Sequence, residues 1–248
     1  MKKSLLTVCL IIFSAFISTA SAEEIDEIMF EADTYYGSRE ISGSAETSVK
    51  LYEEALKIDP YYYDAYWKLA RAYKWLGDHA KEGERIPLYE KGEKHAKDAI
   101  EVKEDGGEGH FYYGMLIGKI GEERGVLNSL FLVDPIKKEM ENVLEIEPGQ
   151  GDAHIALSVL YRKAPGWPFS CGDTKKAKKH ALKAIEYNPN RIRYYLELGR
   201  AYVSMGDYEN ARKVLETAID LPFESDFVPE GKKDKKDAKE LLEEIKEK

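Results

Sequence analysis

The stretch GDYENARKVLETAIDLP, from Gly206 to Pro222, repeats the pattern of an upstream stretch, GDTKKAKKHALKAIEYNP, from Gly172 to Pro189. Both begin with Gly-Asp, both carry an alanine five residues after the glycine, and both contain Ala-Ile near the end. The two glycines are 34 residues apart. A chain that repeats one pattern at a fixed interval builds the same small unit several times, so further copies are expected.

A period of 34 residues is typical of tetratricopeptide (TPR) repeats, which are antiparallel helix pairs. In the clearest copy, apolar and small residues follow helical spacing from Tyr195 to Tyr202, and Gly206-Asp207 ends that helix and caps the next. The same spacing recurs in three earlier segments: Tyr66 to Tyr73, His110 to Ile117 and His154 to Tyr161. Such a pair cannot bury its own apolar faces. We therefore predict an all-α, right-handed superhelical solenoid of about five helix pairs over residues 23–222.

Residues 223–248 follow the last repeat with a polar loop and a charged segment, KKDKKDAKELLEEIKEK. Ala238, Leu241, Leu242 and Ile245 form one apolar stripe in this segment, and the other positions are charged or polar. This pattern predicts a C-terminal capping helix, apolar on the inner face and polar on the outer face. A free charged tail is the alternative.

The middle repeats are longer than the others. Gly77 and Gly121 are 44 residues apart, which predicts insertions at residues His79 to Leu88 and Glu122 to Val133. A third insert, RKAPGWPFSC, contains Trp167 and Phe169 outside the repeat pattern. These rings either cover the junction of the fourth repeat or form a recognition surface on a stiff backbone. We favour the cover, because large apolar rings are usually buried.

These irregular features resemble those of two protein families. The long middle repeats, the apolar segment GVLNSLFLVDP and the stretch YRKAPGWPFSCGDTKKAKKHALKAI resemble the secreted bacterial T components (TatT) of tripartite ATP-independent periplasmic (TRAP) transporters. A weaker similarity is to the eukaryotic regulator of microtubule dynamics family. The first resemblance implies a helical array that associates with a periplasmic substrate-binding protein and binds a hydrophobic or amphiphilic ligand.

The N-terminal residues have the layout of a secretory signal peptide. Lys2 and Lys3 precede an uncharged, mostly apolar run, Leu5 to Ile17, and Ala20-Ser21-Ala22 is a small-x-small cleavage site. We predict a cleaved signal over residues 1–22, no transmembrane segment after cleavage, and a periplasmic or secreted protein. An uncleaved anchor is the alternative, although the run is shorter than the about 20 residues that span a bilayer.

Composition and motifs argue against nucleic-acid binding and catalysis. The net charge is −9, whereas a protein that tracks phosphates needs a basic stripe. No nucleophile elbow, phosphate-binding loop or zinc-protease motif occurs. His110 and His154 occupy equivalent positions in consecutive repeats, but no third metal ligand recurs with them. We predict a protein that is not an enzyme, with no cofactor and no metal site.

The concave groove of the array is the predicted binding site, because first helices line it in TPR proteins. The positions next to the core stripe are apolar with scattered cations: Trp67, Arg71, Lys74, Phe111, Met115, Lys119, Ile155, Val159, Arg162 and Arg200. We predict a non-catalytic periplasmic scaffold that holds a protein partner there, with Trp167 and Phe169 as possible loop contacts. The alternative is a TatT-like component that binds an apolar ligand together with a periplasmic substrate-binding protein.

Overall fold

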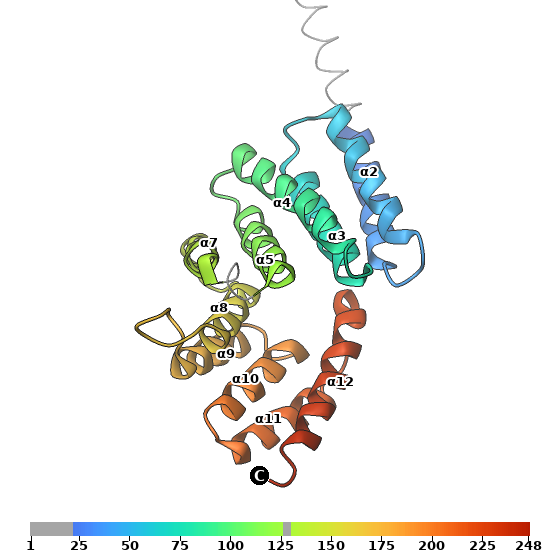
Figure 1. The fold of residues 1–248 in the computed structure, drawn as a ribbon. Helices are drawn as coiled ribbons and strands as arrows, with labels where there is room; N and C mark the ends of the chain where they lie inside the picture. The colour runs from blue at the N-terminus through green and yellow to red at the C-terminus, as the bar shows by residue number, and fades with distance from the viewer. Residues whose placement is uncertain (1–21, 126–129) are drawn as a thin grey trace, which may run out of the picture. The chain divides into compact units, whose positions relative to one another are not determined.

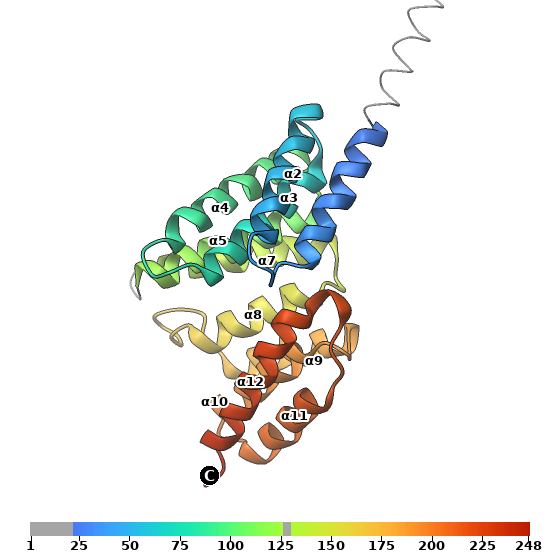
Figure 2. The same ribbon diagram turned by 90° about the vertical axis from the view of Figure 1, so that its right-hand side faces the viewer.

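The computed structural model describes residues 22–125 and 130–248, and the regular structure in these ranges consists of helices (Figures 1 and 2). The chain divides into two compact units at Glu104 and Asp105, and each unit is described by itself. The predicted signal peptide lies outside the described residues except for Ala22. Within the described ranges, no helix combines the length and the apolar character needed to cross a bilayer.

The first unit contains two helix pairs. A helix over residues 22–37 pairs with α2 (Ser44–Ile58), and α3 (Tyr63–His79) pairs with α4 (Arg85–Val102). Apolar side chains from the first three helices form one buried core: Ile25, Met29, Ala32, Val49, Tyr52, Ala55, Ala65, Leu69, Ala72 and Tyr73. The helical spacing of these residues in the sequence therefore corresponds to buried faces.

The second unit contains three more pairs and a final helix. The elements are α5 (Gly107–Arg124), α7 (Val133–Ile146), α8 (Gly151–Lys163), α9 (Thr174–Tyr187), α10 (Ile192–Ser204), α11 (Tyr208–Asp220), the short 3-10 helix η1 (Ser225–Phe227) and α12 (Val228–Glu244). Consecutive helices pack on one another, as in a solenoid. The described residues thus confirm the predicted all-α architecture of helix pairs.

Small residues let the two helices of a pair approach closely. A Cβ atom added to Gly199 of α10 would lie 2.6 Å from the Leu215 side chain of α11. A Cβ atom added to Gly114 of α5 would collide with the Met140 side chain of α7. Ser158 of α8 stands at the equivalent position, and its hydroxyl donates to the Ala177 carbonyl at 2.9 Å.

The two insertions predicted in the long middle repeats lie partly within helices. Helix α3 continues to His79 and α4 begins at Arg85, so only a short turn separates them. Helix α5 likewise continues to Arg124, and α7 begins at Val133. Much of the extra length therefore lengthens helices, because the added residues extend their packing faces. Residues 126–129 of the second predicted insertion lie outside the described residues.

Helix α12 covers the end of the array. Ala238 and Ile245 are buried, and Leu241 and Leu242 are partly buried, in one cluster with apolar residues of α10 and α11. The predicted stripe is the buried face, so the segment is a capping helix and not a free tail.

The loop between α8 and α9 contradicts the prediction that its two aromatic rings cover the junction of the fourth repeat. Trp167 is 90% exposed and Phe169 is 80% exposed. Hydrogen bonds close the base of the loop instead, since the amide of Gly172 donates to the Pro165 carbonyl at 2.9 Å and the amide of Asp173 donates to the Tyr161 carbonyl at 2.8 Å. Backbone bonds hold this loop, and the rings face solvent.

Candidate protein-interaction surface

Arg71 of α3 is held by side chains of its own unit. Its guanidinium lies 3.9 Å from the centre of the Tyr36 ring and 5.0 Å from that of the Trp67 ring. Its Nη2 atom donates to the Tyr52 hydroxyl at 3.3 Å and lies 3.5 Å from Asp33. The side chain is therefore fixed in one position before any partner binds.

Asp33 ties the helix over residues 22–37 to α2 and α3. It accepts from the Tyr52 hydroxyl and from the Lys68 ammonium, each at 2.7 Å. Burial raises the pKa of Tyr52, although the charge of Arg71 opposes this effect. The Tyr52 hydroxyl therefore stays protonated and remains a donor to Asp33.

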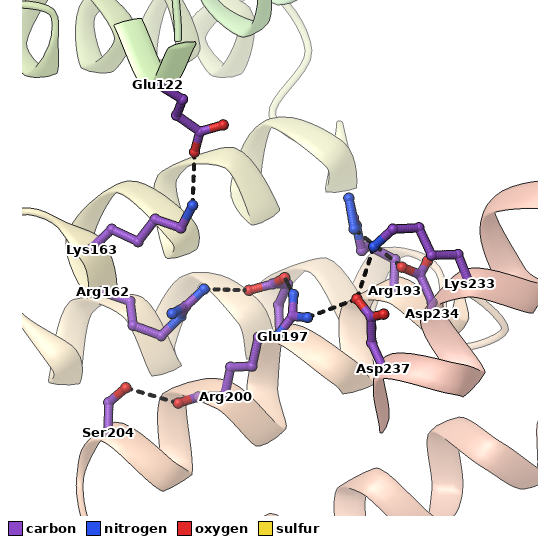
Figure 3. A network of polar contacts seen from close by, with 10 residues as sticks. All are labelled: Glu122, Arg162, Lys163, Arg193, Glu197, Arg200, Ser204, Lys233, Asp234 and Asp237. Atoms are coloured by element: carbon purple, nitrogen blue, oxygen red, sulfur yellow. Dashed lines mark hydrogen bonds and ion pairs between the residues drawn. The ribbon is translucent and has the colours of Figure 1, made fainter. Parts of the chain in front are cut away.

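A second polar network joins α8, α10 and α12 in the second unit (Figure 3). Glu197 of α10 pairs with Arg162 of α8 at 3.1 Å and with Arg200 one turn further along α10. Arg200 also pairs with Asp237 of α12 at 2.9 Å, and Asp237 pairs with Lys233 at the same distance. Two predicted groove cations, Arg162 and Arg200, thus have internal carboxylate partners.

Glu197 is the buried centre of this network, with only 3% of its side chain exposed. Burial alone would raise its pKa, but Arg200, Arg193 and Arg162 together hold the pKa below its ordinary value. The carboxylate is therefore charged at neutral pH and fixes the guanidinium groups around it.

Two more ion pairs connect helices of the same unit. Arg193 of α10 pairs with Asp234 of α12 at 3.1 Å, and Lys163 of α8 pairs with Glu122 of α5 at 2.7 Å (Figure 3). Burial raises the pKa of Asp234, an effect that the Arg193 charge opposes. Charges on the α8 and α10 faces therefore serve helix packing in the free protein.

The apolar members of the predicted groove divide into buried and half-buried residues. Ile155 is 6% exposed and packs in a buried cluster of α8, α9 and α10, so its assignment to the exposed groove was wrong. Val159 is half-buried against this cluster. Phe111 and Met115 of α5 are half-buried as well, and Phe111 packs against the α7–α8 core.

The remaining predicted cations lie near carboxylates on their own helices. Lys74 pairs with Asp78 at 2.7 Å, and Lys119 lies 4.0 Å from Glu122. The predicted surface of scattered cations is therefore neutralised in the free protein. It is a mixed-charge face with half-buried aromatic and aliphatic residues.

His110 and His154 are both buried, but the structure pairs them with different residues. The Nδ1 atom of His110 lies 2.6 Å from Glu139, and that of His154 lies 3.0 Å from Nδ1 of His180. Among the described residues, no group of three or more His, Cys, Asp or Glu side chains could hold a metal ion.

Sequence reasoning missed the residues that hold the cations. Asp33 is 38 positions from Arg71, and Asp237 is 37 positions from Arg200. Helical spacing identifies the face of a helix, but it does not show which distant side chain covers that face. The sequence does show Asp234 and Asp237 three residues apart beside the predicted capping stripe. This spacing indicates that both carboxylates lie close to the face that packs on the array.

Comparisons with known proteins place these features in a family context. The family model described as regulator of microtubule dynamics protein 1-3 matches residues 28–246. Regulator of microtubule dynamics protein 3 of Mus musculus is 25% identical over 197 residues, which cover 72% of this chain and 40% of that protein. Protein 1 of Bos taurus is 25% identical over 249 residues, covering 91% and 73%.

A bacterial relative shares the repeat. TPR repeat-containing protein YpiA of Bacillus subtilis is 25% identical over 178 residues, covering 71% of this chain and 36% of that protein. The chain thus spans less than half of the length of this relative and of the mouse protein.

Solved structures with low sequence identity share the fold. The TPR protein TTC0263 of Thermus thermophilus has a TM-score of 0.67 at 14% identity, covering 88% of this chain and 98% of that chain. PilF of Pseudomonas aeruginosa has a TM-score of 0.60 at 15% identity, covering 91% and 93%. YrrB, described as a TPR protein with an unusual peptide-binding site, has a TM-score of 0.50 at 15% identity, covering 90% and 98%. These likenesses establish a TPR-type fold.

Proposed function

We propose that this chain, which belongs to the regulator of microtubule dynamics protein 1-3 family, is a non-catalytic scaffold that binds a protein partner on the first helices of its repeats. The observation that carries the proposal is the fixed arrangement of Arg71 and Trp67 of α3 with Tyr36 of the helix over residues 22–37. Arg71 lies between the Tyr36 and Trp67 rings, 3.9 Å and 5.0 Å from their centres.

This arrangement suits recognition for two reasons. Tryptophan, tyrosine and arginine are the residues that most often dominate binding energy at protein interfaces. A guanidinium held in place by its own unit also loses little conformational entropy when a partner binds. The half-buried Phe111, Met115 and Val159 offer apolar contacts of the same kind in the second unit.

The leader-like sequence of residues 1–22 supports a location outside the cytoplasm, in the periplasm or beyond it. The peptide-binding site named for YrrB supports a polypeptide as the bound partner. A periplasmic substrate-binding protein is the candidate partner that follows from the resemblance to TatT proteins. A role in microtubule dynamics is stated in the names of the relatives and applies to those proteins.

Site-specific photo-crosslinking in the native host tests the proposal. A photoreactive phenylalanine analogue replaces Trp67 or Met115 on first helices, and Ile146 of α7, an exposed position on a second helix, is the control. We expect the same polypeptide to be captured from Trp67 and from Met115 and not from Ile146. Equal capture from all three positions, or capture from Ile146 alone, would contradict a first-helix binding face.

The TatT-like alternative predicts a different bound species. Native mass spectrometry of the protein purified from its host would then show an additional mass of lipid size. A protein without such a mass that captures one polypeptide in the crosslinking experiment supports the scaffold. A lipid-sized mass that is lost when Met115 is replaced by a charged residue supports the carrier.

A further inference from the structure

The loop between α8 and α9 presents two aromatic side chains that the fold of the second unit does not use. Trp167 and Phe169 are 90% and 80% exposed, in a chain whose other two tryptophans, Trp67 and Trp75, are half-buried. Figures 1 and 2 show this loop standing out from the ends of the two helices. Exposing two large rings is unfavourable in water unless the rings contact something else.

The base of the loop is built to hold the rings in place. Besides the two backbone bonds that close it, the amide of Phe169 donates to the Gly166 carbonyl at 3.1 Å. Gly172 allows the close approach of the two loop ends, since a Cβ atom at this position would collide with the Ala164 carbonyl. The aromatic tip is therefore a defined feature of the fold.

Lysines gather where the loop enters α9, and two of them, Lys175 and Lys179, are unfavourable for this helix. Lys175, Lys176, Lys178 and Lys179 occupy the first turns of this helix, and its first turn has no acidic residue. Cations are unfavourable at the positive end of a helix dipole, and like charges four residues apart, such as Lys175 and Lys179, repel each other. In the described part of the chain, neither of these two lysines has an ion-pair partner.

In the next repeat, an ion pair takes the place of these two lysines. Glu209 of α11 occupies the position equivalent to Lys175, and Lys213 occupies that of Lys179. These two side chains form an ion pair at 2.7 Å. The repeat thus accommodates a favourable Glu–Lys pair at this site, and α9 carries two lysines instead.

The positive potential around α9 also acts on its buried histidine. The pKa of His180 is lowered to about 4, mainly by burial and then by the charges of His154, Lys179, Lys183 and Lys176. Lys175, Lys176 and Lys179 are exposed in the first turns of α9, next to the loop. Because charges are screened beyond about 8 Å in physiological salt, this local positive charge acts independently of the net charge of −9.

We infer that the α8–α9 loop and the first turns of α9 form a docking surface for an anionic membrane. Trp167 and Phe169 enter the interface between head groups and acyl chains, where aromatic rings are favoured, and the lysines contact the anionic head groups. The loop projects from the helices, which fits insertion into a bilayer surface and does not fit a site that enfolds a peptide. The inference is independent of the proposed partner site on the first helices.

Flotation with lipid vesicles tests the inference on the protein as purified from its host. We expect binding to vesicles of phosphatidylcholine with 30% phosphatidylglycerol and little binding to phosphatidylcholine alone. Trp167→Ser with Phe169→Ser should weaken binding at least about tenfold, since it removes the inserted apolar area. Brominated lipids should quench the wild-type fluorescence and leave that of Trp167→Phe nearly unchanged.

Lys175→Glu separates this role from a structural one. It recreates the pair seen in α11, so the helix should become more stable, while a charge change of two units should weaken vesicle binding about 30-fold. Lys236→Glu, the same charge change at an exposed position of α12, is the control and should bind as the wild type does.

Three results would overturn the docking surface. The first is equal binding to anionic and neutral vesicles, and the second is equal weakening by Lys175→Glu and Lys236→Glu. The third is a wild-type protein that ignores vesicles and binds polyglutamate, which would assign the surface to an acidic polypeptide. Each of these results leaves the photo-crosslinking test of the first helices unaffected.

Discussion

Glu197 shows how one buried charge can organise three helices. Its carboxylate is 3% exposed and holds Arg162 of α8 and Arg200 of α10, and Arg200 in turn holds Asp237 of α12. A buried ion pair contributes little net stability, because the cost of removing both charges from water offsets their attraction. Removing one partner is different, since the remaining charges stay buried without compensation.

We therefore expect Glu197→Ala to destabilise the protein by about 3–5 kcal/mol, because Arg162 loses its carboxylate partner and Arg200 keeps only Asp237. Urea unfolding followed by circular dichroism measures this change. Glu209→Ala, which removes an exposed ion pair of α11, is the control and should lower the midpoint only slightly. Equal midpoints for the two variants would show that Glu197 has no structural role.

His180 makes stability depend on pH. One of the two Nδ1 atoms of His154 and His180, which lie 3.0 Å apart, must accept the hydrogen bond, so at least one ring is neutral. Burial lowers the pKa of His180 from 6.5 to about 4 in the folded state. As the pH falls from 6.5 towards 4, the unfolded chain gains a proton that the folded chain does not, so stability is lost in this window.

Between pH 7 and pH 5 the wild type should therefore lose about 2 kcal/mol more than His180→Gln, which has no proton to gain. Urea unfolding at both pH values measures the difference. His79→Gln, which replaces an exposed histidine of α3, should retain the full pH dependence of the wild type. If His180→Gln retains it as well, other groups cause the loss.

Among the elements, α12 is the one whose removal would expose the end of the array. Ile245 is 1% exposed and lies in a cluster with Leu215 and Ala218 of α11. Ile245→Ala should lower the free energy of unfolding by about 2–4 kcal/mol, as other buried large-to-small changes do. Leu182→Ala, at an exposed position of α9, should cost well under 1 kcal/mol. A small effect of Ile245→Ala would mean that α12 is a dispensable tail.

The sequence predicted the helix pairs correctly, but the same Gly-Asp dipeptide has different roles in two repeats. Gly77-Asp78 has the same letters as Gly206-Asp207, which does end α10 and cap α11: Gly206 has a left-handed φ of 74°, and Asp207 accepts from the amide of Asn210. In α3 the helix continues through Gly77, because the Tyr89 ring packs directly against that glycine.

The role of Asp78 explains the rest of this difference. Its carboxylate accepts from Lys74 at 2.7 Å and from the Tyr89 hydroxyl at 2.9 Å, so it caps no helix. The left-handed turn comes at Gly83 instead, with φ 90°. A Gly-Asp dipeptide therefore predicts a turn only if no distant side chain packs on the glycine or binds the aspartate. The sequence does not show such contacts.

The candidate surface was predicted only in part, because the sequence does not show which distant side chains contact each other. Helical spacing identified Trp67, Arg71, Arg162 and Arg200 as neighbours of the core stripe, and the structure places all four at the edge of the packed faces. Helical spacing could not show that Asp33 and Asp237 neutralise the arginines. Nor could the general burial preference of tryptophan predict Trp167, because the backbone bonds of its loop hold the ring in solvent.

At the scale of the whole molecule, stability depends on contacts between successive helices. In each unit a helix packs mainly on those that precede and follow it in the sequence. The stability of such an array is close to a sum of repeat terms and nearest-neighbour terms. A defect in one repeat should therefore loosen its neighbours first, and distant repeats much less.

Gly199→Val tests this expectation. The added Cβ atom would lie 2.6 Å from the Leu215 side chain, so α10 and α11 must separate, at a cost of about 1–3 kcal/mol. Hydrogen exchange followed by mass spectrometry should show faster exchange in α10, α11 and α12, and unchanged exchange in α2, α3 and α4. Gly37→Val is the matched control, because nothing lies within 4 Å of an added Cβ atom there. Uniformly faster exchange in both units would mean that the whole chain unfolds as one cooperative body, and that local repeat packing does not set its stability.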